Sequence, residues 1–117
     1  MRGLMMDMPL TITSIMQHAD QNHSQGEIVS VTADNPDHRY TYADAFRRVR
    51  QLANALAKKG LRPGDRIATL AWNDYRHFEL YYAVSCAGQV CHTVNPRLFP
   101  EQIEYILNHA EDRWVFV

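Results

Sequence analysis

The sequence predicts an α/β protein, a Rossmann-like parallel sheet with flanking helices that follows a helix and a β-hairpin. Helical and strand patterns alternate from about residue 41 onward, which implies right-handed parallel crossovers. The strands expected in this part are short apolar runs without alternation, as in strands that are covered on both faces. The 117 residues are 46% hydrophobic and 21% charged, which fits one soluble globular domain with a buried core.

A helix and a hairpin are expected first. Apolar residues at helical spacing predict a helix over residues 11–21. Residues 27–32 (EIVSVT) read as a strand, residues 33–37 supply turn chemistry, and residues 38–40 form a second short strand. These two strands predict a β-hairpin. The first helix is expected to pack one apolar stripe against the core. The stripe comprises Ile12, Ile15, Met16 and Ala19.

A second, strongly amphipathic helix begins after Thr41. Thr41 and Asp44 have the spacing of a capping box, with Asp in place of the usual Glu. Gly60 can take the left-handed conformation that ends a helix. The stripe expected in the core is Phe46, Val49, Leu52, Ala53 and Leu56. The basic residues of this helix are interpreted as its solvated face, with a basic binding patch as the alternative; they are Arg47, Arg48, Arg50 and Lys58.

The remaining residues carry alternating strands and helices. Strands are predicted over residues 67–71, 90–94 and 114–117. Asn73 or Asp74 caps a helix that is apolar nearly all round and is therefore expected to be largely buried. Pro100 suits the first turn of a helix, which is expected to bury the stripe Ile103, Ile106, Leu107 and Ala110. Because the sequence stops inside the last predicted strand, an incomplete protein is expected.

Composition and charge exclude several classes of partner. Twelve Lys and Arg against thirteen Asp and Glu give a formal net charge of -1, so neither nucleic acid nor an anionic membrane is indicated. Cys86 and Cys91 lie in apolar segments, which favours reduced thiols in a reducing compartment. No signal peptide and no apolar stretch of about 20 residues is found, so a cytoplasmic location without a transmembrane segment is expected.

The sequence carries no complete catalytic, nucleotide-binding or metal-binding motif. None of the six His forms a short paired spacing with Cys or another His that would suit zinc. The glycine-rich motifs that cradle phosphates, G-x-G-x-x-G and G-x-x-x-x-G-K-[ST], are missing. The G-x-S-x-G motif of a hydrolase nucleophile is missing too. No catalytic residue and no metal ligand is therefore assigned.

One loop has the position of a ligand site. Residues 92–98 (HTVNPRL) follow the carboxyl end of a predicted parallel strand and lead into a helix N-terminus, where α/β folds usually place ligands. The guanidinium of Arg97 beside free helix amides suits a phosphate through charge-assisted hydrogen bonds. The alternative is structural: Asn95 and Pro96 shape a turn, and Arg97 is solvated or ion-paired.

Several segments read together resemble the fatty-acyl-CoA synthetases of the adenylate-forming superfamily, particularly bacterial medium- and long-chain fatty-acid CoA ligases. They are YTYA (40–43), LRPGDRIA (61–68), AWN (71–73), RHFELYYA (76–83), GQVCHTVNPRL (88–98) and ILNHAED (106–112). The resemblance starts near Leu10 and covers nearly the whole chain. It implies that residues 10–117 belong to the large N-terminal AMP-binding domain, as one truncated subdomain.

This family activates a fatty acid with ATP and Mg²⁺ to an acyl-adenylate, and CoA then displaces AMP. The resemblance implies that Arg97 approaches a CoA phosphate. The Ser/Thr/Gly-rich phosphate loop, the ribose-binding Asp and the adenylation Lys of the family are absent from these residues, so this chain alone is expected to be inactive and to bind ATP, Mg²⁺ or CoA poorly. The rival hypothesis is a freestanding α/β module that binds a partner or CoA. Residues 1–9 are expected to form a frayed tail or a homodimer arm, for which Met5, Met6 and Met8 are suited.

Overall fold

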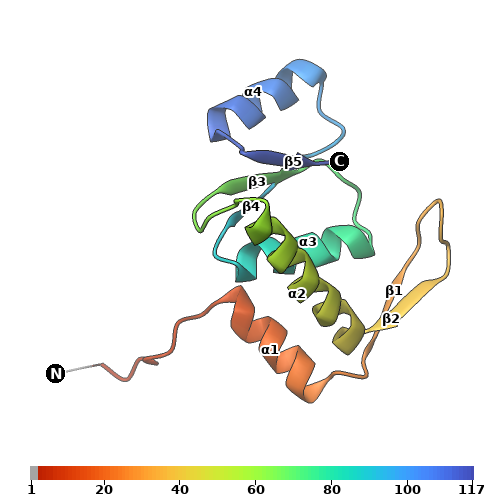
Figure 1. Cartoon of the computed structure of the whole chain (residues 1–117), viewed down its shortest axis with the longest axis vertical. Coiled ribbons are helices and arrows are strands. Elements are labelled where there is room, and N and C mark those ends of the chain that lie inside the picture. The colour runs from red at the N-terminus through yellow and green to blue at the C-terminus, as the bar shows by residue number, and fades with distance from the viewer. Residues whose placement is uncertain (1–2) are drawn as a thin grey trace.

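The predicted α/β order is confirmed by the structure, a computed structural model that describes residues 3–117 (Figure 1). Residues 1 and 2 of the expected tail or dimer arm lie outside the described residues. The elements are α1 (Ile12–Asn22), β1 (Glu27–Ser30), β2 (His38–Thr41), α2 (Tyr42–Lys58), β3 (Arg66–Thr69), α3 (Tyr75–Cys86), β4 (Val90–Thr93), α4 (Pro100–Ala110) and β5 (Trp114–Phe116).

The strands form two separate sheets. β1 and β2 pair antiparallel, as the predicted hairpin requires, and the other three strands are parallel in the order β4-β3-β5. Ile67 at the centre is level with Cys91 on one side and Trp114 on the other. The chain moves from β3 to β4 and then back across β3 to β5. Right-handed crossovers in opposite directions place their helices on opposite faces, and Figure 1 shows α3 and α4 on opposite sides of this sheet.

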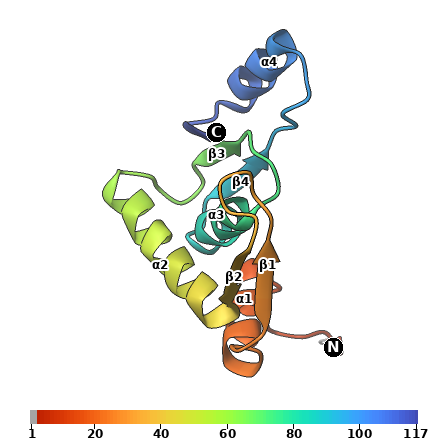
Figure 2. The same cartoon turned by 90° about the vertical axis from the view of Figure 1, so that its right-hand side faces the viewer.

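A layer of helices supplies most of the core. α1, α2 and α3 pack together on one side of the sheet, and α4 lies at the far end of the molecule (Figure 2). Phe46 and Val49 of α2 are buried against Met16 of α1 and Ala83 of α3. A second cluster joins this layer to the sheet, and its buried members are Leu56, Leu61, Ile67, Leu80 and Val84.

The ends of α2 follow the predicted chemistry. The Thr41 hydroxyl accepts a hydrogen bond from the Asp44 amide at 3.2 Å, while the Asp44 carboxylate accepts one from the Thr41 amide at 3.4 Å. Both bonds satisfy amides that the first helical turn leaves free, so the predicted capping box is confirmed. Gly60 follows the helix with φ of 86°, the left-handed conformation that glycine adopts without strain.

The basic face of α2 is occupied by ion pairs. Arg47 pairs with Asp44 of the same helix, and Arg50 pairs with Asp20 of α1. Arg48 pairs at 2.6 Å with Glu79 of α3, whose side chain is buried, so this carboxylate depends on its cation. Arg48 and Arg50 thus join α2 to its neighbouring helices, and Arg47 is paired within α2, which favours the structural interpretation over a basic binding patch.

The structure corrects three expectations. Ile12 and Ile15 of the expected α1 stripe are 45% and 55% exposed, because α1 contacts the cluster it shares with α2 and α3 only through Met16 and Ala19. Four strands end earlier than predicted. β1 and β3 end two residues early, at Ser30 and Thr69, and β4 and β5 end one residue early, at Thr93 and Phe116.

No residue of α4 is buried; its stripe Ile103, Ile106, Leu107 and Ala110 is only partly covered. The physical reason is that α4 crosses its face of the sheet with no second helix of the described part beside it (Figure 1). Across residues 3–117, no helix is both long enough and apolar enough to cross a bilayer.

Candidate functional site

A crevice lies at the carboxyl ends of β3 and β4. The loop after β3 leads to α3 on one face of the sheet, whereas the loop after β4 leads to α4 on the other face. Neighbouring parallel strands whose loops diverge in this way open the crevice where α/β folds bind ligands. Its cavity volume is about 460 Å³. The residues that give it chemical character are Trp72, Asn73, His77, Tyr81, Asn95 and Arg97.

The β4 side of the crevice presents a positive charge. The Asn95 side-chain oxygen accepts a hydrogen bond from the Arg97 amide at 3.0 Å, which fixes the turn that projects Arg97. The Arg97 guanidinium lies over the indole ring of Trp72, 5.2 Å from the ring centroid. It makes no ion pair with any carboxylate of residues 3–117, and it is exposed. Its charge is therefore available to an anionic ligand.

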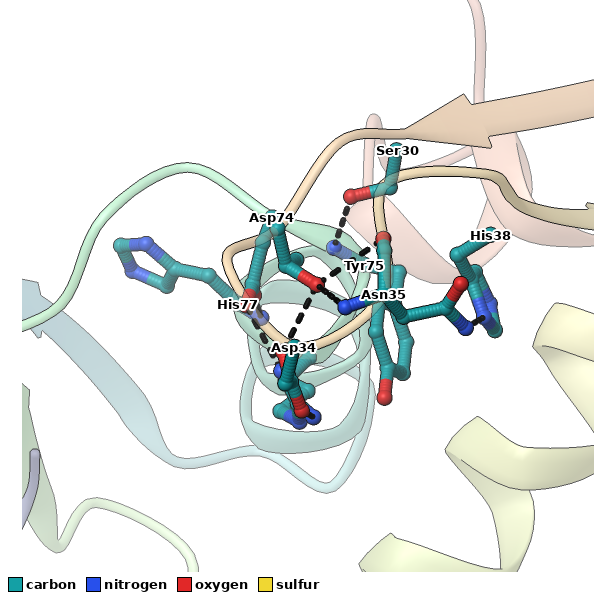
Figure 3. Close-up of polar contacts among 9 residues, drawn as sticks. Ser30, Asp34, Asn35, His38, Asp74, Tyr75 and His77 are labelled. Carbon is teal, nitrogen blue, oxygen red and sulfur yellow. Dashed lines mark hydrogen bonds and ion pairs between the residues drawn. The ribbon is translucent and has the colours of Figure 1, made fainter.

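The opposite side is built on the N-terminus of α3, which the hairpin holds in place (Figure 3). Asp74 caps the helix by accepting a hydrogen bond from the His77 amide at 2.9 Å. The buried Ser30 hydroxyl of β1 accepts one from the Tyr75 amide at 3.0 Å. Two amides that the first turn leaves free are thereby satisfied. The loop that carries Trp72 and Asn73 is thus fixed at its α3 end.

The loop between β1 and β2 adds an ion pair and a ring stack. Arg76 of α3 donates to Asp34 at 2.6 Å. This hydrogen bond, with a second from the Thr32 hydroxyl, lowers the pKa of Asp34 to about 2. The His38 ring stacks on Tyr75 with centroids 3.7 Å apart, and the Asn35 side chain lies 3.4 Å from the His38 ring nitrogen Nδ1 (Figure 3). The β1–β2 hairpin therefore contacts the first turn of α3 through both an ion pair and a ring stack.

His77 lies at the floor of the crevice. It is buried, its Nε2 lies 2.8 Å from the Thr69 hydroxyl at the end of β3, and its ring stacks on Tyr81. His77 Nδ1 is buried and has no partner among the described residues. The contact with Thr69 ties α3 to the sheet. No group of three His, Cys, Asp or Glu suited to a metal ion occurs in residues 3–117, and nothing here resembles an activated nucleophile.

The structure places Arg97 where the sequence predicted it, and adds one residue that sequence reasoning missed. Trp72 is 65% exposed and lines the crevice opposite Arg97. The sequence does contain a signal for Trp72, because it lies just past the carboxyl end of β3. β3 pairs in parallel with β4, the strand that precedes Arg97. The expected free helix amides are less available, because the Phe99 amide already donates to the Gln102 side chain at 3.2 Å.

Comparison with known proteins decides the family. The profile of AMP-binding enzymes matches residues 16–117. The chain belongs to the AMP-binding enzyme family. It is 54% identical over 116 residues to a 3-methylmercaptopropionyl-CoA ligase of Ruegeria lacuscaerulensis, covering 99% of this chain and 22% of the relative. It is 52% identical to a medium-chain-fatty-acid–CoA ligase of Ectopseudomonas oleovorans, covering 100% of this chain and 21% of the relative.

The fold of this AMP-binding chain is shared with solved acyl-CoA synthetases. A Mycobacterium tuberculosis fatty acyl CoA synthetase superposes with a TM-score of 0.78 and 26% identity, over 90% of this chain and 20% of that one. The predicted family and fold class are thereby confirmed. The chain spans about a fifth of the length of the relatives that it matches. The crevice is therefore built from residues that correspond to only about a fifth of these relatives.

Proposed function

We propose that these residues are the N-terminal segment of an ATP-dependent fatty-acid CoA ligase. Such an enzyme activates the acid with ATP and Mg²⁺ to an acyl-adenylate, and the CoA thiol then displaces AMP. The observation that carries the proposal is identity of 50–54% along the whole chain to relatives that are named CoA ligases. Residues 10–117 then form one subdomain of the AMP-binding domain. The free thiols Cys86 and Cys91 suit a cytoplasmic enzyme.

Relatives that are named for different acids share high identity with this segment. Relatives named for 3-methylmercaptopropionate and for medium-chain fatty acids match equally well, and a long-chain-fatty-acid–CoA ligase of Thermus thermophilus is 45% identical. A segment that varied with the acid would separate these relatives. We therefore assign it to a step that all of them share, and the unpaired cation of the crevice favours CoA, which carries phosphates, as its ligand.

Within this function, Arg97 holds a phosphate of CoA. Its guanidinium is exposed in the crevice and is unopposed by any carboxylate of the described part. Use of ATP and Mg²⁺ requires a phosphate loop, and these 117 residues carry none, so the chain alone neither releases pyrophosphate nor forms a thioester. Turnover by the 117-residue chain, freed of longer enzyme, contradicts this assignment.

The two half-reactions test the proposal in the complete gene product. Acid-dependent exchange of pyrophosphate with ATP reports adenylate formation, and thioester formation reports CoA use. Arg97→Ala should lower the CoA-dependent step roughly 10- to 150-fold, equal to about 1.5–3 kcal/mol for one charge-assisted contact. Arg97→Lys should recover part of this loss, because an ammonium keeps the charge without the planar fork.

Arg62→Ala is the matched control. Arg62 is exposed and likewise lacks an ion pair among residues 3–117, but it precedes the amino end of β3, whereas the crevice lies at the carboxyl end of that strand. It should leave both half-reactions unchanged. If Arg97→Ala leaves the KM for CoA unchanged, Arg97 does not bind CoA. If Arg97→Ala impairs both half-reactions to the same extent and lowers the Tm, the role of Arg97 is structural. Absence of acid-dependent exchange in the unmodified gene product refutes the ligase function itself.

We also propose that the N-terminal arm joins two copies of the enzyme. Residues 3–10 run away from α1 (Figure 1) and leave five large apolar side chains exposed. They are Leu4, Met5, Met6, Met8 and Leu10. Flexible Met side chains suit an adaptable interface. In the gene product with all three Met changed to Ser, light scattering should give the mass of a monomer. If the variant still has the mass of a dimer, these residues form a tail and not an interface.

A further inference from the structure

The pair formed by Trp72 and Arg97 is built from two loops that are fixed independently. The Trp72 loop runs from the end of β3 to the Asp74 cap of α3. The Arg97 loop is fixed by the Asn95 side chain. The two loops share no hydrogen bond between their side chains, yet they bring the guanidinium 5.2 Å from the centroid of the indole. A contact at this distance is a cation–π interaction.

Trp72 is placed unusually for its size. It is 65% exposed and belongs to neither of the two hydrophobic clusters. Burial of its ring in the core therefore does not account for its position. Its recorded aromatic contact is with Arg97, and both side chains line the crevice.

The contact with Trp72 leaves both the charge and the N–H donors of Arg97 available to a ligand. A carboxylate partner, as seven other arginines have here (Arg39, Arg47, Arg48, Arg50, Arg66, Arg76 and Arg113), would neutralise the charge and use its N–H donors. The indole does neither, because it attracts the cation through its ring electrons. It also restricts a long, flexible side chain before binding, which lowers the entropy lost when the ligand arrives.

We propose that Trp72 is a positioning residue: its indole holds the Arg97 guanidinium over the crevice with the donors free for a phosphate of CoA. This inference rests on the proposed function and deepens it. Trp72 acts through Arg97 and does not itself touch the reacting atoms. Its contribution therefore exists only while Arg97 is present.

A double-mutant cycle in the complete gene product tests this dependence, with CoA as the probe. Trp72→Leu should raise the KM for CoA about two- to fivefold, the fold-change equivalent of about 0.5–1 kcal/mol for an exposed cation–π contact. Trp72→Phe should recover part of that, since a smaller ring keeps a weaker attraction. In the Arg97→Ala background, Trp72→Leu should add nothing. Arg62→Ala serves as the control, and the KM for ATP in pyrophosphate exchange separates loss of CoA binding from misfolding.

Each other outcome overturns a named step. A further rise in the KM for CoA when Trp72→Leu is added to Arg97→Ala shows that the indole contacts the ligand directly, which refutes the positioning role. An effect of Arg97→Ala with none of Trp72→Leu refutes it as well. If Arg97→Ala itself leaves the KM for CoA unchanged while acid-dependent exchange persists, the CoA contact and the role of Trp72 both fail and the ligase function stands.

Discussion

Removal of the Ser30 hydroxyl should loosen the first turn of α3. Ser30 is 8% exposed, and its hydroxyl oxygen accepts the Tyr75 amide at 3.0 Å. Ser30→Ala leaves that partly buried amide without an acceptor, which costs about 1–3 kcal/mol. Amide hydrogen exchange in the first turn of α3 should therefore accelerate roughly 5- to 150-fold. The change should reach Trp72 and Asn73, since their loop ends at this turn.

Hydrogen exchange measured by NMR or mass spectrometry resolves this turn from the rest of the chain. The control is Ser24→Ala, because the Ser24 side chain makes no hydrogen bond to the described residues. It should change exchange in α3 by less than the equivalent of about 0.5 kcal/mol. Unchanged exchange at Tyr75 in Ser30→Ala would refute the reasoning that the hairpin fastens α3, as would equal acceleration in both variants.

Two further predictions concern the core and the pH dependence of stability. Phe46→Ala should lower the free energy of unfolding by about 3–5 kcal/mol in urea denaturation, because Phe46 is fully buried; the exposed Phe99→Ala should cost far less, and equal losses contradict the assignment of the core. Arg76 holds the folded-state pKa of Asp34 at about 2, so the ionised carboxylate stabilises the fold above pH 3.8 and this contribution disappears as pH falls through about 2. Asp34→Asn should remove that part of the pH dependence, and an Asp34 carboxyl that titrates near 3.8 by NMR excludes the ion pair in solution.

Local patterns in the sequence were sufficient to predict every helix and strand, because each pattern has a physical cause within a few residues. The capping box at Thr41 and the glycine after α2 are examples. Strand ends were predicted less well. Leu70 and Val94 lie beyond the assigned strands, although their amides still donate to the Phe116 and Thr69 carbonyls. Apolar residues thus continue past the regular ladder, and composition alone does not show where pairing stops.

Burial of α4 was not predictable from its own pattern. The spacing of its apolar stripe specifies which side of the helix faces a partner, but not whether a partner is present. Strand order is a tertiary property too: the reversal that separates α3 from α4 follows from β5 pairing with β3 and not with β4.

The β4 side of the candidate site was predictable from the sequence, and the β3 side was not. Arg97 was found because it follows a parallel strand and precedes a helix. Trp72 was missed as its partner, because their contact joins two loops that are adjacent only through the pairing of β3 with β4. The buried Ser30 hydroxyl was missed for the same reason, since its acceptor role depends on where the hairpin meets α3.

The strand order also affects how the chain folds during synthesis. β3 is the first of the three parallel strands to be made, and both of its neighbours come later in the chain. α1, the hairpin, α2 and α3 all emerge before β4, so the helical layer packs while β3 still has free backbone groups on both edges. One of these edges stays open until Trp114–Phe116 emerges. An unpaired apolar strand is a template for pairing with other chains, so a nascent chain that pauses before β5 is made is prone to aggregate through the open edge of β3.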